Sequence, residues 1–239
     1  MGSRRHRHLN RTHCGAVIDL DSRFITGVSD GDNPASWPNR GDSANNFTRG
    51  GTASGLVYDT NQQGGQPRMR YPNTTATLRR TGFNPVSWGY SNAHTIVSAC
   101  RDAKGDSTVR LLYNWNTSPT NLMQLFAQFS DNVMYFDHGR GSSPGRISAA
   151  VSTNSSPVIL SGMCDGSNGS VRRNGAQVVS GAMSASVSSS SQTFDLGSIT
   201  TTNHWVGDYY AFIHGPMASE SIRRRIEQSV AYSFKIPNG

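Results

Sequence analysis

Glutamate, cysteine and long apolar runs are what this sequence has least of. Only two glutamates occur among the 239 residues, Glu220 and Glu227, and both lie near the C-terminus. Glycoside hydrolysis needs two carboxyl groups flanking the scissile bond. Asp19 and Asp21 could form such a pair, but residues two apart near a strand end more often cap a turn. We therefore expect no glycosidase activity and, more generally, no enzymatic activity.

The three cysteines, Cys14, Cys100 and Cys164, show no framework spacing. An odd number without such spacing predicts folding in a reducing cytosol, with Cys100 as a small buried residue on a strand. No apolar segment follows the N-terminus in the manner of a secretory signal peptide, and no apolar run reaches membrane-spanning length. We expect a protein that folds in a host cytoplasm and has no membrane partner.

Short motifs of common enzyme classes are missing as well. There is no G-x-S-x-G, H-E-x-x-H, Walker or dinucleotide-binding glycine motif. A Ser/His/Asp triad could be assembled on paper from the seven histidines and many serines, but no local signature supports one. His204 and His214 are interpreted as loop-end residues that pack on aromatic side chains.

Basic residues are abundant and give a formal net charge of +7 at pH 7. This charge permits attraction to nucleic acid, anionic polysaccharide or an acidic protein surface. Residues 1–15 form a basic arm, which is either solvated or ordered against an acidic partner in an assembly. Its candidate partner-binding residues are Arg4, Arg5, Arg7 and Arg11. Nucleic acid is not the expected partner, because basic stretches interleaved with stacking aromatics are absent.

From residue 16 onward, short β-prone runs alternate with turn residues. Strands are predicted at Thr95–Cys100, Ser107–Trp115, Leu122–Phe129, Val133–Phe136, Arg146–Val151, Pro157–Met163 and Trp205–Ile213. Val109, Leu111, Tyr113 and Trp115 alternate at period two, which predicts one core-facing side. Asn174-Gly175 predicts a type I′ hairpin turn, Gly139–Gly141 a turn, and Ser184–Ser191 an exposed loop or edge.

One amphipathic helix is predicted at the C-terminus, over about residues 219–236. Ser219 is the expected N-cap, and Pro237 ends the helix. The apolar stripe consists of Ile222, Ile226, Val230 and Phe234. The consecutive arginines 223–225 are interpreted as a solvated outer face, partly paired with Glu227.

The order of several motifs resembles the concanavalin A-like, laminin-G-like jelly-roll domains. The motifs are Ile18–Asp21, Ser36–Asn46, Gln66–Tyr71, Asp165-Gly166, Arg173–Ala176, Phe194–Gly197, Gly207-Asp208 and Arg225–Ile236. The resemblance covers roughly residues 16 to 236. It implies an all-β, concanavalin A-like (laminin-G-like) jelly-roll β-sandwich of two antiparallel sheets with a C-terminal α-helix, as one domain over residues 16–239. The family often has an acidic residue three positions after Gly-Asp, where this chain has Ala211.

Such domains occur in phage structural proteins and bacterial surface proteins, and two hypotheses follow. The first is a non-enzymatic structural virion protein, a capsid decoration or cement protein in contact with the major capsid protein or tail components, and able to form a homo-oligomer. The alternative is a carbohydrate-binding adhesin or lectin module of a phage tail or fibre or of a bacterial cell surface. In the alternative, Trp37, Trp88 and Tyr90 stack on sugar rings, although each could equally be a core residue.

Calcium is the one metal that the resemblance suggests, because laminin-G-like sandwiches often bind it through loop carboxylates. Candidate ligands are Asp30, Asp32, Asp42, Asp165 and Asp208. No loop has the ligand density of an EF-hand, so calcium stays an option and no other metal or cofactor is expected.

Overall fold

The computed structural model describes residues 15–41, 45–50, 55–72, 76–90, 92–102, 109–115, 122–140, 144–150, 156–187, 189–197, 204–216 and 219–238. The strands are β1 (Ile18–Asp21), β2 (Ser36–Trp37), β3 (Phe47–Arg49), β4 (Val57–Asp59), β5 (Arg68–Tyr71), β6 (Thr77–Phe83), β7 (His94–Asp102), β8 (Arg110–Trp115), β9 (Leu122–Gln128), β10 (Val133–Arg140), β11 (Arg146–Ala150), β12 (Val158–Cys164), β13 (Asn168–Arg173), β14 (Ala176–Ala182), β15 (Gln192–Gly197) and β16 (Gly207–Gly215). Short 3₁₀ turns are η2 (Ser22–Phe24), η3 (Gln63–Gly65) and η4 (Val86–Trp88), and helix α1 spans Glu220–Phe234.

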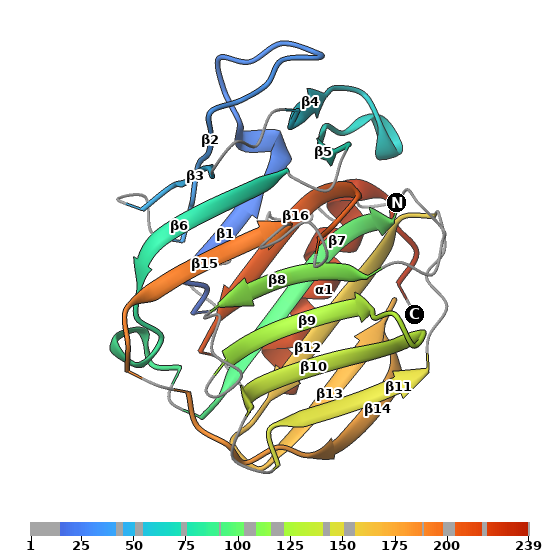
Figure 1. Ribbon diagram of the computed structural model, residues 1–239. Coiled ribbons are helices and arrows are strands. Elements are labelled where there is room, and N and C mark those ends of the chain that lie inside the picture. Colours follow the sequence, from blue (N-terminus) through green and yellow to red (C-terminus); the bar gives the residue numbers. More distant parts are fainter. Residues whose placement is uncertain are drawn as a thin grey trace.

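The strands form two antiparallel sheets that pack face to face (Figure 1). Sheet A has the order β14-β13-β12-β7-β16-β5-β4, with β1 paired to β16. Sheet B has the order β11-β10-β9-β8-β15-β6-β3-β2. Sequential hairpins build one end of each sheet, whereas β7–β16 and β15–β6 join segments far apart in the chain. The predicted all-β sandwich with a C-terminal helix is confirmed.

Aromatic side chains fill the space between the sheets. Phe194 makes edge contacts with Phe47 and Phe83, at ring-centroid distances of 5.8 and 5.4 Å. Trp115 is fully buried and donates its indole N–H to the carbonyl of Phe83 at 2.9 Å. Such contacts give the two sheets one continuous apolar core.

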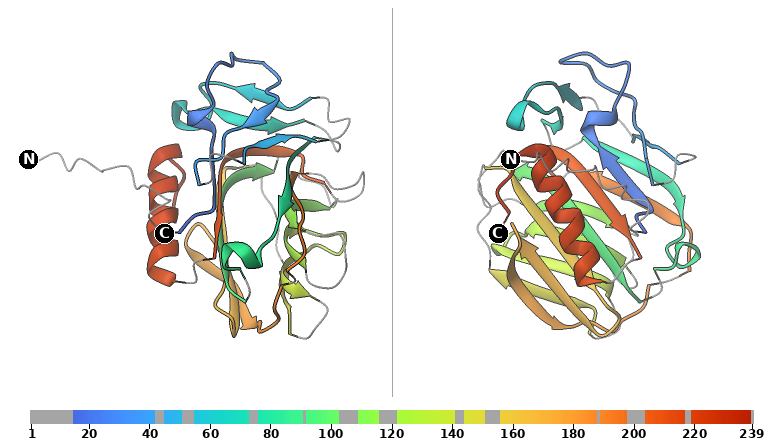
Figure 2. Two further views of the ribbon diagram at one scale, coloured as in Figure 1. Left: turned by 90° about the vertical axis from the view of Figure 1, so that its left-hand side faces the viewer. Right: turned by 180° about the vertical axis from the view of Figure 1, so that it is seen from behind.

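Helix α1 covers the outer face of sheet A, on the side away from sheet B (Figure 2). Ile226, Val230 and Phe234 of the predicted stripe are buried there against sheet A residues such as Val97 and Ile159. Residue 219 precedes the helix as predicted, but its hydroxyl contacts Ser221 and caps no backbone N–H. The helix is therefore anchored by its apolar side.

The prediction that all three helix arginines are solvated is wrong for Arg223. Its side chain is almost fully buried and bonds Glu220 and Glu227. Glu227 in turn accepts a hydrogen bond from Ser161 of β12. Arg224 and Arg225 are exposed, as predicted. The difference arises because position 223 lies beside the Ile226 stripe and faces the sheet.

Local irregularities account for three further differences. The register shifts on both sides of Leu111, which pairs with Phe126 and leaves the core-facing row. Strand β10 continues through the predicted Gly139–Gly141 turn as far as Arg140, with Gly139 at φ +64° and a register shift. In the segment predicted as an exposed loop, Ala185 and Val187 are buried. The type I′ turn is confirmed, with positive φ at residues 174 and 175.

Candidate functional site

The two outer faces of the sandwich differ. Helix α1 packs on sheet A, whereas no helix or strand of the described chain packs on the outer face of sheet B (Figure 2). We call this second surface the sheet B face. Because alternate residues of a strand point to opposite sides, Met134 and Phe136 of β10 enter the core while Tyr135 and Asp137 lie on the sheet B face.

A continuous row of polar residues crosses this face, one from each of seven neighbouring strands. In strand order the polar row is Thr48 (β3), Arg79 (β6), Asp195 (β15), Asn114 (β8), Gln124 (β9), Asp137 (β10) and Arg146 (β11), and each residue is in register with the next. At about 4.8 Å between neighbouring strands, the row is about 29 Å long. Thr48, Arg79 and Arg146 at its two ends are solvent-accessible, and the four residues between them are buried.

A second, largely apolar row lies beside the first on the same face. It consists of Leu111, Phe126, Tyr135 and Ser148, also directly paired from strand to strand. Phe129, which follows β9, makes edge contacts with Phe126 at 5.2 Å and with Tyr135 at 5.8 Å between ring centroids. We call this set the aromatic row. Tyr135 and Phe129 are its partly accessible rings, whereas Phe126 is buried.

The two rows are joined around Arg146. Its guanidinium binds both carboxylate oxygens of Asp137, with Nε–Oδ1 at 2.5 Å and Nη2–Oδ2 at 2.7 Å. Gln124 donates to the same carboxylate at 2.5 Å. The guanidinium carbon of Arg146 also lies 4.3 Å from the centre of the Tyr135 ring. The tyrosine hydroxyl donates to Asp131 at 2.6 Å. The Tyr135 ring is therefore held by Arg146 over the ring and by Asp131 at the hydroxyl.

The far end of the polar row repeats this pairing. Arg79 binds Asp195 through Nε at 2.8 Å and Nη2 at 3.3 Å. This hydrogen bonding raises the pKa of Arg79, so its guanidinium stays charged. The middle of the row is buried, whereas the Arg79 and Arg146 side chains are 37% and 27% exposed. Their Nη1 groups are not used in the two ion pairs, and each can donate to a ligand.

The structure separates the three aromatics that were predicted to bind sugar. Trp37 and Tyr90 are fully buried in the core between the sheets, so neither can stack on a ligand. The prediction is wrong for these two residues. Trp37 lies on the two-residue strand β2 and Tyr90 lies just after η4, so each core aromatic is surrounded by turn residues in the sequence and resembles a loop residue. Trp88 lies on η4 and is 37% exposed, with the guanidinium of Arg80 5.3 Å from its ring centre. It follows β6, which is four strands away from β10 in sheet B.

Four of the five candidate calcium ligands lie in the described structure, and each is bonded to other groups of the protein. Asp30 accepts hydrogen bonds from Thr60, Asp32 from Ser29, and Asp165 from the backbone at 167 and 168. Asp208 is held by Arg68 and Arg101 at 2.9 and 2.5 Å, and two guanidinium cations exclude a third cation there. Within the described ranges, no three His, Cys, Asp or Glu side chains are placed to hold a metal ion. Asp42 and the arm arginines 4, 5, 7 and 11 lie outside the described residues.

Other reactive side chains are paired or buried. Asp21 caps η2 and binds Arg23, and Asp19 lies 3.7 Å from Arg40, so this pair serves a turn as the sequence indicated. Cys100 and Cys164 are buried free thiols, and burial raises the pKa of Cys100 to about 12. A thiol with that pKa is not a nucleophile near neutral pH.

Three comparisons place the fold among known proteins. No family model and no curated protein sequence matches the chain. Among solved structures, the chain is similar to domain 4 of AbnA, a GH43 extracellular arabinanase from Geobacillus stearothermophilus, in complex with arabinotriose. The two chains are 15% identical, the match covers 88% of this chain and 97% of that chain, and the TM-score is 0.63. The chain is also similar to the binding domain of botulinum neurotoxin DC in complex with rat synaptotagmin II (9% identity, 91% and 52% coverage, TM-score 0.64).

A third similar structure is that of botulinum neurotoxin type C, described with two ganglioside molecules, at 11% identity and a TM-score of 0.63. The match covers 92% of this chain and 52% of that chain. The chain thus spans about half of the neurotoxin structures and nearly all of the arabinanase domain. These similarities, with the two antiparallel sheets, establish a concanavalin A-like jelly-roll β-sandwich. In the described part of the chain, no helix combines the length and apolarity needed to cross a membrane.

Sequence reasoning missed the residues of the sheet B face. The signal was present in Val133–His138, where Met134 and Phe136 alternate with Tyr135 and Asp137. Alternation alone does not say which set faces the core, because Tyr suits either side of a strand. Cross-strand register then places Arg146, Gln124 and Asp137 together, and register is set by the whole sheet.

Proposed function

We propose that this protein is a non-enzymatic carbohydrate-binding module that binds a neutral glycan along the sheet B face. The observation that carries the proposal is the pair of parallel rows, one polar and one aromatic, on the one sheet face that no described helix or strand covers. Sugars have hydroxyl groups at their edges and C–H groups on their ring faces. Hydroxyls suit the guanidinium and amide donors, and a C–H face suits the Tyr135 ring.

The preference for a neutral ligand follows from the charges of the polar row. Two arginines and two aspartates occur in it, and each arginine is paired through two hydrogen bonds. The pairs cancel the charge and leave directional N–H donors. An anionic sugar would gain little attraction and would approach Asp137 and Asp195 closely. The net charge of +7 is carried elsewhere on the chain.

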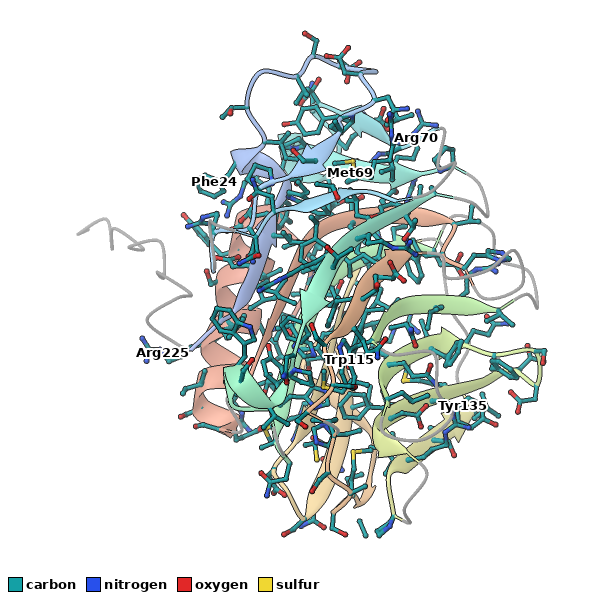
Figure 3. The ribbon with its side chains drawn as sticks, turned by 60° about the vertical axis from the view of Figure 1, so that its left-hand side comes forward. Phe24, Met69, Arg70, Trp115, Tyr135 and Arg225 are labelled. Atoms are coloured by element: carbon teal, nitrogen blue, oxygen red, sulfur yellow. The ribbon has the colours of Figure 1, made fainter. Side chains whose placement is uncertain are left out.

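The structural neighbours support a binding role without establishing it. The arabinanase domain was solved in complex with arabinotriose, and the type C neurotoxin is described as interacting with gangliosides. Figure 3 shows Tyr135 on the side of the sandwich opposite Arg225 of helix α1, with Trp115 between them. A ligand on the sheet B face would therefore contact neither α1 nor the basic residues of its outer surface.

The first test is binding to an array of neutral and anionic oligosaccharides, followed by calorimetry, with arabinotriose as the first soluble probe. We expect binding of a neutral oligosaccharide, and a loss of about five- to tenfold in affinity for Tyr135→Ala, because one stacked ring contributes about 1–1.5 kcal/mol. Tyr232→Ala is the matched control, since Tyr232 is 63% exposed on helix α1. No binding to any neutral glycan, or equal losses in both variants, would contradict the proposal.

Salt dependence tests the neutral character of the ligand separately. Surface charge attraction is screened over about 8 Å at 0.15 M ionic strength, whereas hydrogen bonds and stacking are not. We expect the affinity to change by less than about twofold between 50 and 500 mM NaCl. A selective, strongly salt-dependent affinity for sulfated or uronic-acid sugars would agree with glycan binding. It would contradict the proposal that the glycan is neutral.

The virion hypothesis stays a prediction. Its proposed contacts use the basic arm, and residues 1–14 lie outside the described residues. A capsid, tail or cell-surface location is compatible with a glycan-binding sandwich, and the fold does not choose among them.

A further inference from the structure

Three histidines are buried in the core between the two sheets. His94 on β7 and His214 on β16 come from sheet A, and His138 on β10 comes from sheet B. All three are fully buried. Tyr90 and Tyr113, also fully buried, complete what we call the histidine cluster. Histidine is seldom fully buried in this way, and three together in an otherwise apolar core need a physical account.

The rings of the cluster stack across the gap between the sheets. The His94 ring lies 4.6 Å from that of His138 and 5.0 Å from that of His214, and His214 stacks on Tyr90 at 4.9 Å. Nδ1 of His94 faces Nδ1 of His138 at 2.5 Å, and its Nε2 is 3.1 Å from the hydroxyl of Tyr113. Nδ1 of His214 is 2.8 Å from the hydroxyl of Tyr90. The cluster thus joins both sheets through ring nitrogens.

These contacts satisfy neutral imidazoles and offer no negative charge to a protonated one. The contact between His94 and His138 has room for one proton, donated by one Nδ1 and accepted by the other. A second proton would set two N–H groups against each other at 2.5 Å. His214 uses only Nδ1, and its Nε2 has no hydrogen-bond partner in the described structure. A charged His214 would therefore bury an N–H group that has no acceptor, and a charged His94 would have only a neutral imidazole and a hydroxyl as acceptors.

Among the described residues, the ring-nitrogen partners of His94 and His214 are a histidine and two tyrosine hydroxyls, and none is a carboxylate. Around them pack the rings of Phe136, Phe194 and Phe212 from β10, β15 and β16. The titratable and charged neighbours on the packed elements are Tyr90, Tyr113, Cys164, Arg80 and Asp137. The Arg80 cation acts on Tyr90 and opposes a further positive charge. Asp137 is engaged on the sheet B face by Arg146 and Gln124.

We propose that the histidine cluster is a pH switch that holds the two sheets together at neutral pH and releases them in mild acid. Burial lowers the pKa of His94 well below its usual value and that of His214 to about 3, with the neighbouring histidines adding to both effects. In the unfolded chain both side chains titrate near pH 6.5. The stability that they confer is therefore complete above pH 6.5 and is lost as the pH falls from there towards 3.

The size of the effect follows from proton linkage. Between pH 8 and pH 5, the unfolding equilibrium constant rises about thirtyfold for each histidine that stays neutral in the folded state, and about a thousandfold for His94 and His214 together. This window lies above the titration of Glu220, whose pKa the hydrogen bonds from Arg223 lower to about 2. Burial raises the pKa of Asp195 and Asp208, so proton uptake by these two carboxylates in the folded protein opposes the histidine effect as the pH falls.

The test is urea unfolding of the full chain at pH 8, 7, 6 and 5. From pH 8 to pH 5, the unfolding equilibrium constant of the wild type is expected to rise about a thousandfold. That of His214→Gln should rise only about thirtyfold, because glutamine can still bond Tyr90 and does not titrate. Phe136→Leu is the matched control: its ring lies 5.2 Å from His94, so it loosens the same packing without removing a titrating group. It should lower stability at every pH and keep the wild-type pH dependence.

Histidine NMR of the wild-type protein gives a second test that needs no variant. We expect the His94 and His214 ring signals to stay at the neutral position down to pH 5 in the folded protein. Native-state titration of either ring near pH 6.5 would overturn the proposal. So would a wild-type unfolding constant that changes less than about threefold from pH 8 to pH 5, or an unchanged pH dependence in His214→Gln.

Discussion

The buried charges of helix α1 are paired within the helix, and Glu227 bonds sheet A through Ser161. Arg223 and Glu227 are both almost fully buried, and they bond each other and Ser161 of β12. Burial alone would strongly disfavour both charges, and removal of one partner leaves the other uncompensated. The pair therefore fixes the rotation of helix α1 on sheet A more than it adds net stability.

Glu227→Ala is expected to lower the free energy of unfolding by about 3 kcal/mol, because Arg223 then keeps a buried charge with only Glu220 as partner. Urea unfolding at pH 7.5 measures this change. Gln228→Ala, at the exposed neighbouring position, should change stability by less than about 0.5 kcal/mol. Similar small losses in both variants would show that the buried pair contributes nothing.

At the residue scale, the sequence could identify candidate aromatic residues, but it could not show which of them lie in the core and which lie on the surface. Trp37 and Tyr90 are in the core, Trp88 is 37% exposed, and the partly accessible rings of the aromatic row are Phe129 and Tyr135. Tyr and Trp combine a large apolar body with a polar group, so their identity does not decide between core and surface. Only the side of each strand that faces the core decides this.

Elements were predicted well where the pattern is local. Helix α1 follows from its four-residue stripe, and the β13–β14 turn from Asn174-Gly175, whose backbone has positive φ at both positions. Strand β8 departed from its alternation because register shifts flank Leu111. A bulge depends on the partner strand, so it has no reliable signal within one strand.

Ile226 tests how helix α1 is anchored. Ile226→Asp buries an unpaired carboxylate against sheet A and is expected to lower stability by several kcal/mol and to release the helix. Thermal melting followed by circular dichroism measures both effects. Arg225→Asp places the same residue at an exposed neighbouring position and should leave the melting temperature within a few degrees. An unchanged melting temperature in Ile226→Asp would contradict the packing of α1.

At the scale of the whole molecule, the pairing of distant strands creates both the polar row and the histidine cluster. The polar row needs β6, β15 and β8 side by side, and the histidine cluster needs residues 94, 138 and 214 in one place. No periodicity in a single segment specifies such pairings. The motif resemblance supplied the overall fold, whereas the register that positions each site comes from packing across the two sheets.

Three parts of the sandwich carry different features. Helix α1 covers sheet A, the space between the sheets holds the histidine cluster, and the sheet B face presents the two rows. Strand β10 links the last two, because His138 points into the core and Tyr135 and Asp137 lie on the opposite side. Acid that loosens the core should therefore also disturb the proposed glycan face.

The most direct test of the account is NMR mapping of the bound neutral oligosaccharide on the isotopically labelled full chain. We predict that the largest shift changes occur at Gln124, Tyr135 and Arg146, with smaller ones along the polar row towards Arg79, and none on helix α1. Changes centred on Trp88 and η4, or on the helix side of sheet A, would contradict the assignment of the sheet B face as the binding surface.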